Sequence, residues 1–448
     1  CQHCILISPG KNQPMQIRLF ILGVLFSVSA NAQDSIFTAK DAVDIALKQN
    51  LDIQIAQSDV EITKINNTWA NAGMLPTITA QATNTEAISN LNQKLNNGNS
   101  IQRSNVKNNS LNANMVLSWR IFNGMRVQAT KDRFEIIEKM GSIAFKQQVD
   151  QVIFDVLSVY YNLVRLNKQV NSTLAIIDLS KERVKIAETR FNVGSGTKTD
   201  MLQAKIDLNA QEVNLKNIFK QISTTKATLN NLMKRSPQEP IVAKEEQFKI
   251  PTIDLAEIVK KIDEQNYQML MANQTKLNLS NDRRIIVSQK LPTLTLNSSA
   301  LLNRTISTAG LFLTNQTYGP NVGLSIGIPI FQSNINRTQL KVNAVQQKQQ
   351  ALEIEALRSR IQRDIFIAYQ EYQNAIEATK IEESNVKLAE ENNKISTERF
   401  RKLQSNSIEL RQAQLSLNDA QDRYINAQYR AHIAATSILY TIGEISNF

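Results

Sequence analysis

Between Ile330 and Ile442 the chain contains neither proline nor glycine. Helix interiors exclude these two residues, because proline lacks an N–H donor and glycine loses the most backbone entropy on folding. Proline is also absent from 77–236. An ordinary α/β enzyme places turn residues far more often. The sequence therefore predicts a mainly α protein built on very long helices.

The longest predicted helices cover 124–191 and 333–400. At ~1.5 Å per residue each would be roughly 100 Å long, which is too long for the interior of a globular domain. They must lie in a coiled coil or in the wall of a tube. One apolar stripe at helical spacing indicates a packing seam and consists of Leu357, Ile361, Ile365, Ala368, Tyr372 and Ala375.

The two halves of the chain repeat each other. Leu75-Pro76-Thr77 returns as Leu291-Pro292-Thr293, and Ile121-Phe122 returns as Ile330-Phe331. We therefore predict a first repeat at 33–234, a linker at 235–252 and a second repeat at 253–448. Each repeat should contain a helix, a strand–loop–strand unit, a long helix and a final helix. The first helices are expected at 39–73 and 253–289, the final helices at 200–234 and 408–442, and the loops at 88–110 and 303–320.

Apolar and small polar residues alternate along 111–121 and again along 322–330. A soluble sheet with one face on a core shows this pattern, and so does a strand that spans a membrane. Aromatic residues near the strand ends and an export signal favour the membrane. Four strands cannot close a barrel, so several chains must combine. The residues expected to face lipid are Leu111, Met115, Leu117, Trp119, Val322, Leu324, Ile326 and Ile328.

Residues 15–32 have the pattern of a secretory signal peptide, with Arg18, an apolar run and an Ala-x-Ala site that ends at Ala32. Residues 1–32 should therefore be removed. Removal takes away both cysteines and one of the two histidines, which excludes thiol nucleophiles and Cys/His zinc sites. The remaining charge is 49 − 40 = +9, spread along helices, and does not indicate nucleic-acid binding. We identify no catalytic, cofactor or metal residues.

A glycine-containing motif follows the first long helix: Arg190-Phe-Asn-Val-Gly194-Ser-Gly196-Thr-Lys-Thr-Asp200. Together with the repeated Leu-Pro and Ile-Phe motifs, it resembles the TolC-type outer-membrane efflux channel family. The resemblance implies a homotrimer in the outer membrane of a Gram-negative bacterium. It implies a membrane β-barrel, closed by trimerisation with four strands per chain, that continues into a long antiparallel helical tube in the periplasm. It also implies a passive exit duct for efflux or type I secretion, with a periplasmic adaptor and an inner-membrane pump as partners.

The resemblance assigns adaptor docking to the first turn, at Val193, Gly194, Ser195, Gly196 and Thr197. The second turn, 402–407, has no glycine and departs from the family pattern. The resemblance also suggests a periplasmic gate at Asp200 and Glu409, with Lys198 or Arg411 as ionic partners. The alternatives are that Asp200 is a plain helix N-cap and that Glu409 is a solvated acid.

Other classes of protein fit the sequence less well. A periplasmic adaptor would carry one helical hairpin flanked by larger β-domains, and a structural coiled coil would need no strands. An enzyme would need a convergent polar constellation, and none is evident.

Overall fold

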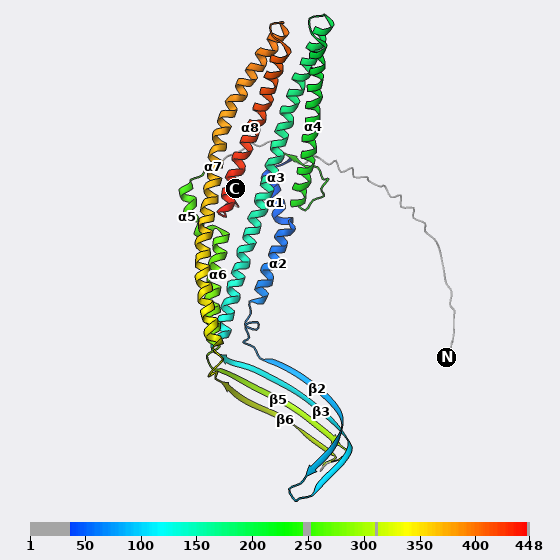
Figure 1. Ribbon diagram of the computed structural model, residues 1–448, viewed down its shortest axis with the longest axis vertical. Coiled ribbons are helices and arrows are strands. Elements are labelled where there is room, and N and C mark those ends of the chain that lie inside the picture. The colour runs from blue at the N-terminus through cyan, green and yellow to red at the C-terminus, as the bar shows by residue number, and fades with distance from the viewer. Residues whose placement is uncertain (1–35, 245–251, 310–311, 446–448) are drawn as a thin grey trace, which may run out of the picture.

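The computed structural model describes residues 36–244, 252–309 and 312–445. The signal peptide predicted within 1–32 lies outside these residues, as does the central part of the linker. The chain is strongly elongated, with helices along most of its length and a curved sheet at one end (Figure 1). This arrangement is the predicted mainly helical fold with a small β part.

Four long helices form the body of the molecule, and each begins and ends within two residues of its predicted bounds. Helices α3 (Arg126–Asn192) and α7 (Ile335–Arg401) have 67 residues each, and α4 (Lys198–Leu232) and α8 (Ser407–Thr441) have 35 each. Their contacts place them side by side in the order α7, α8, α3, α4 (Figure 1). Among the described residues, α7 and α4 are the two edges of this layer, called the wall below, and α6 packs against both α3 and α7 in the half nearer the sheet.

The helices predicted at 39–73 and 253–289 are each broken in two. The first becomes α1 (Ala39–Gln49) and α2 (Leu51–Asn66), and the second becomes α5 (Leu255–Gln265) and α6 (Tyr267–Ser288). The breaks fall at Asn50 and Asn266, which occupy equivalent places in the two repeats.

The two asparagines break these helices by the same hydrogen bonds. The Asn50 Oδ1 atom accepts from the backbone N–H groups of Asp52 at 2.8 Å and Ile53 at 3.3 Å, and its Nδ2 atom donates to the Leu232 carbonyl at 2.9 Å. Asn266 Oδ1 accepts from the Met269 N–H, and its Nδ2 donates to the Thr441 carbonyl at 2.7 Å. Each asparagine thus begins one helix and holds the end of another, and both are buried.

Two apolar cores stabilise the middle of the wall. One joins α1 to α3 and the end of α4, and the other joins α5 to α7 and α8. The first core also includes a short parallel pair of strands, β1 (Ile36–Phe37) and β4 (Val242–Ala243). Tyr160 is fully buried beside this pair, and its hydroxyl donates to the Phe37 carbonyl at 2.9 Å.

The larger sheet has four antiparallel strands in the order β2-β3-β5-β6. Their bounds are β2 Thr77–Lys94, β3 Ser100–Asn123, β5 Thr293–Ser307 and β6 Thr314–Gly327. The prediction of loops at 88–110 and 303–320 is wrong, because the strands continue through most of both segments. Their polar side chains stay exposed while the backbone groups pair across the strands, as at Ile88 with Lys107.

No helix within the described ranges is both long enough and apolar enough to cross a bilayer.

Candidate functional site: the hairpin tips and the sheet face

The first tip joins α3 to α4 and contains two glycines. Gly194 has φ +76°, a left-handed conformation that disfavours side chains, and its N–H donates to the Phe191 carbonyl. A Cβ atom on Gly196 would lie only 2.9 Å from the Arg190 Cβ atom. Thr197 then caps α4, because its hydroxyl accepts from the Asp200 N–H at 3.1 Å.

The second tip, between α7 and α8, has the same backbone geometry without glycine. Leu403 occupies the left-handed position with φ +62°, and its N–H donates to the Phe400 carbonyl. Asn406 caps α8 by accepting from the Glu409 N–H at 2.9 Å. A leucine in the left-handed backbone conformation costs about 1–2 kcal/mol, so the second turn has the same backbone shape as the first but is strained.

Asp200 is the third residue of α4 and not its N-cap, which corrects one alternative considered above. Its carboxylate accepts a hydrogen bond from the Ser407 hydroxyl of the other hairpin and one from the Thr197 hydroxyl at 2.7 Å. These two hydrogen bonds, that of Ser407 first, lower the pKa of Asp200. Asp200 therefore remains ionised and connects the two tips.

Glu409 occupies the equivalent position in α8 and pairs within its own hairpin. Arg399 Nη1 lies 2.7 Å from its carboxylate, and both side chains are substantially exposed. The two predicted ionic partners do not pair with either proposed gate carboxylate. Arg411 binds Asp207 instead, and Lys198 forms no ion pair with any residue that the structure describes.

The main charged cluster at the tips was not predicted from the sequence. Arg183 is only 5% exposed, and its Nη2 atom lies 2.6 Å from the Asp207 carboxylate. Asp207 also accepts from Arg411 Nε at 2.8 Å and from Gln203 at 2.8 Å. Burial opposes ionisation of Asp207, but these hydrogen bonds and the Arg183 charge outweigh it and lower its pKa. Arg183 and Asp207 are 24 residues apart, and only the hairpin brings them together.

Hydrogen bonds join the two hairpins in both directions. Near the tips, Arg190 Nη2 of the first hairpin donates to the Phe400 carbonyl of the second at 2.5 Å. Glu182, Asp200 and Asp207 of the first hairpin accept from Arg401, Ser407 and Arg411 of the second hairpin, respectively. A cavity of about 320 Å³ lies between the tips and is lined by residues of both hairpins, including Asp200, Asp207 and Arg411.

The apolar residues of the sheet share one face. The register pairs Ile78 with Leu117, Trp119 with Leu296, and Leu296 with Leu324. Val322 and Ile326 are 72% and 67% exposed, which is unusual for such side chains in a soluble protein. Of the other residues expected to face lipid, Met115, Trp119, Leu324 and Ile328 are exposed and Leu111 and Leu117 are half-buried. Their contact with lipid stays a prediction.

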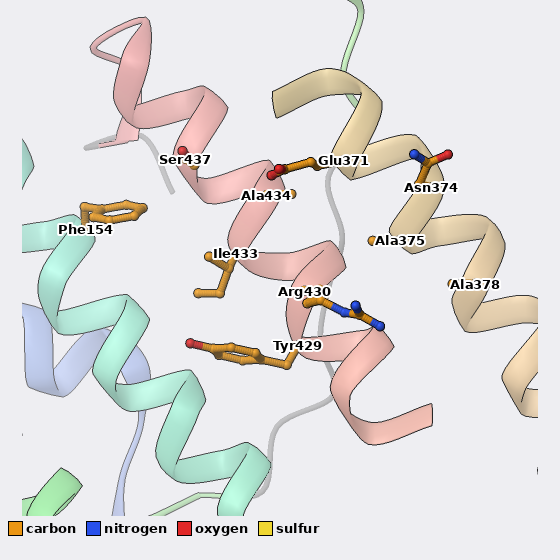
Figure 2. Close-up of a pocket in the computed structure, with 10 residues that line it drawn as sticks. All are labelled: Phe154, Glu371, Asn374, Ala375, Ala378, Tyr429, Arg430, Ile433, Ala434 and Ser437. Carbon is orange, nitrogen blue, oxygen red and sulfur yellow. The ribbon is translucent and has the colours of Figure 1, made fainter. Parts of the chain in front are cut away.

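A cavity of about 530 Å³ lies in the middle of the wall. Figure 2 shows Phe154 of α3 facing Tyr429 and Ile433 of α8, with Glu371 and Asn374 on α7. The lining is mostly apolar, and none of its residues pairs a nucleophile with a base. No cluster of three or more potential metal ligands occurs in the described part of the chain.

The model of a family described as outer membrane efflux protein matches residues 42–233 and 259–444. The chain belongs to the outer membrane efflux protein family. This assignment places it in the outer membrane, with the helical wall as a tunnel in the periplasm. It favours an efflux duct over the adaptor and coiled-coil alternatives.

Solved structures of outer-membrane channels share the fold of this efflux protein. CmeC of Campylobacter jejuni is 17% identical with a TM-score of 0.74, covering 98% of this chain and 94% of that one. VceC of Vibrio cholerae is 16% identical with a TM-score of 0.73, covering 90% and 96%. The channel OprN is 15% identical with a TM-score of 0.74, covering 91% and 90%. No curated protein matched the chain.

Proposed function

We propose that three copies of this efflux protein close a twelve-stranded barrel and form a passive exit duct. A periplasmic adaptor and an energised inner-membrane pump would supply its substrates. The observation that carries the proposal is the open sheet, whose edge strands β2 and β6 have no outer neighbour among the described residues. Unpaired edges are forbidden in lipid, and three copies of four strands leave room for a channel.

The free edges of the helical wall support the same closure. On α7, Ile381, Leu388 and Ile395 recur every seven residues and are 61%, 62% and 51% exposed. On α4, Leu202 and Ile206 are also exposed. A heptad stripe on one edge and an apolar stripe on the other would pack together between neighbouring copies.

Disulfide cross-linking between the two edges tests this closure. Leu202 lies near the start of α4 and Ile395 near the end of α7, so both lie at the tip end. The only native cysteines, Cys1 and Cys4, fall in the segment predicted to be removed. We expect the Leu202→Cys, Ile395→Cys double variant to give a ladder that ends at three chains, and each single variant to stay uncross-linked at this position. A ladder that ends at two chains would contradict the proposal.

We further propose that the tips meet the adaptor at Val193, Gly194, Ser195, Gly196 and Thr197. Val193 is 71% exposed. An exposed apolar residue at the end of the first hairpin is a surface that a partner's apolar tip would cover.

For the gate, we propose that Asp200 and Glu409 of three copies surround one opening. The double variant Asp200→Ala, Glu409→Ala loses the contacts to Ser407 and Arg399 that hold the tips. We expect a higher resting conductance in a planar bilayer. The matched control is Asp178→Ala, which removes an exposed acid from the same hairpin. Equal conductance in all three proteins would remove both carboxylates from the gate.

A further inference from the structure

A further cavity, of about 370 Å³, lies where the sheet joins the helices, a region called the junction below. Its walls come from the end of β3, the start of α3, the α6–β5 link and the segment after β6. A Cβ atom on Gly124 would lie 2.5 Å from the Ser288 carbonyl oxygen, so the two repeats are in close contact here. The polar and charged lining residues are Arg120, Asn123, Arg126, Ser288, Gln289, Thr293 and Gln332.

The cavity contains two cations and no carboxylate. Neither guanidinium, of Arg120 or of Arg126, forms a side-chain hydrogen bond or an ion pair with a residue that the structure describes. An adjoining cavity is also lined by Pro329 and Gln332. Its lining adds Lys290 and Arg337 and likewise contains no acidic residue. The junction of sheet and helices therefore carries positive charge that no carboxylate among the described residues neutralises.

The acids nearest in sequence are already paired. Asp132 binds Arg284, Asp282 binds Arg133, and Glu135 binds Lys131. After Asp282 the next acidic residue in the sequence is Glu353. The junction of sheet and helices thus differs from the tips, where each arginine of the main charged cluster has a carboxylate partner.

The starts of the two long helices add to this positive charge. Neither α3 nor α7 has an acid in its first turn, and α6 has none either, whereas the other five helices each have one. Arg126 is the first residue of α3 and Arg337 lies in the first turn of α7. A cation near a helix N-terminus is unfavourable, and an anion there is favourable. A bound anion would relieve this repulsion.

Strand register places the sheet residues of the cavity on the face opposite the apolar face, while Ile328, which follows β6, also lines the cavity. Arg120 pairs with Thr295 and Thr293 pairs with Gly327, and all four belong to the polar set of the alternation. If the apolar face meets lipid, as the proposed function requires, the cavity opens to the water-filled duct.

We propose that this cavity binds the oxyanion group of solutes in the duct, such as a carboxylate, phosphate or sulfate. Guanidinium groups match these planar or tetrahedral anions through paired N–H donors. Three copies would place six arginines around the passage and give the junction a preference for anions. Because both side chains are exposed, salt screens the effect, which should be clearest at low ionic strength.

The test compares Arg120→Gln, Arg126→Gln with the native protein in a planar bilayer under a gradient of KCl. We expect the ratio of chloride to potassium permeability to fall by about twofold or more in the double variant. The control is Arg304→Gln, which removes an exposed arginine paired with Leu111 on the apolar face of the sheet and should leave the ratio unchanged. Channels with the same ratio in all three proteins would overturn the inference and leave the proposed duct intact.

Phosphate binding to the detergent-solubilised protein, measured by titration calorimetry, tests the cavity without relying on a channel. We expect inorganic phosphate to bind the native protein and Arg304→Gln, and to bind the double variant at least about tenfold more weakly. Equal binding, or none to any of the three, would contradict the anion site. A protein that binds phosphate but forms no channel would instead contradict the proposed duct.

Discussion

The two helical hairpins of this efflux protein have equal lengths and matching turns, yet their chemistry differs. The α3–α4 tip uses Gly194 at the left-handed position, and the α7–α8 tip uses Leu403 at the same place. Near the tips the first hairpin supplies the carboxylates that accept from Arg401, Ser407 and Arg411 of the second. In the reverse direction, Arg190 donates to a backbone carbonyl of the second hairpin. The two turns thus share a backbone shape, while their side chains take different parts in joining the hairpins.

The difference between glycine in the first tip and leucine in the second also indicates that the two tips have different roles. A strained leucine occupies the left-handed position in the second tip, to which no docking is assigned. Glycine remains where Gly196 packs against Arg190 and where the family resemblance assigns docking. The predictions below test whether the first tip is specialised for the adaptor and the second for structure.

The largest effect is expected at Gly194. Gly194→Leu gives the first turn the residue of the second. No atom lies within 4 Å of the added Cβ, and the left-handed strain of about 1–2 kcal/mol is what Leu403 already carries, so the chain should still assemble. We expect export to be lost, because the side chain would occupy the proposed docking surface. Dye retention in cells that depend on this duct measures export, and the detergent-extracted mass measures assembly. Normal export would mean that the adaptor does not dock on this turn.

Asp207→Ala should destabilise the tips by about 3 kcal/mol, because it leaves the buried Arg183 without its carboxylate. Hydrogen exchange of amides in α4 measures this local stability. The matched control is Glu188→Ala, which breaks the exposed pair with Lys205 in the same hairpin and should cost less than about 1 kcal/mol. Similar losses in the two variants would show that Arg183 does not depend on Asp207.

Leu403→Gly is the reverse exchange and should stabilise the second tip by about 1 kcal/mol through relief of the left-handed leucine. Export should be unchanged if docking belongs to the first tip. The change is read from hydrogen exchange of the first turn of α8. A loss of export would assign docking to both tips.

Acid should loosen the first hairpin. The pKa values of Asp200 and Asp207 are lowered in the folded chain from 3.8, so their contribution to stability is full above that value. It is lost as the pH falls below about 4 and through the folded pKa values. Exchange of tip amides as a function of pH checks this. Loosening that begins near pH 6 would point to another group.

The sequence predicted the long helices, the repeats and the turn after α3, because these depend on local propensity and periodicity. It did not predict the breaks at Asn50 and Asn266. Each break is decided by a hydrogen bond to a carbonyl more than a hundred residues away. The strand ends were missed for a similar reason, since backbone pairing across the sheet overrides the loop-like composition of 88–110. The Arg183–Asp207–Arg411 cluster likewise needs three helices to be in place.

The most direct test of the duct is the protein mass of the species that detergent extracts from the outer-membrane fraction. Closure of four-stranded sheets into one barrel predicts three mature chains, found only in that fraction. A monomer or dimer in the periplasm that needs no detergent would mean that the strands form a soluble sheet, and would contradict the duct.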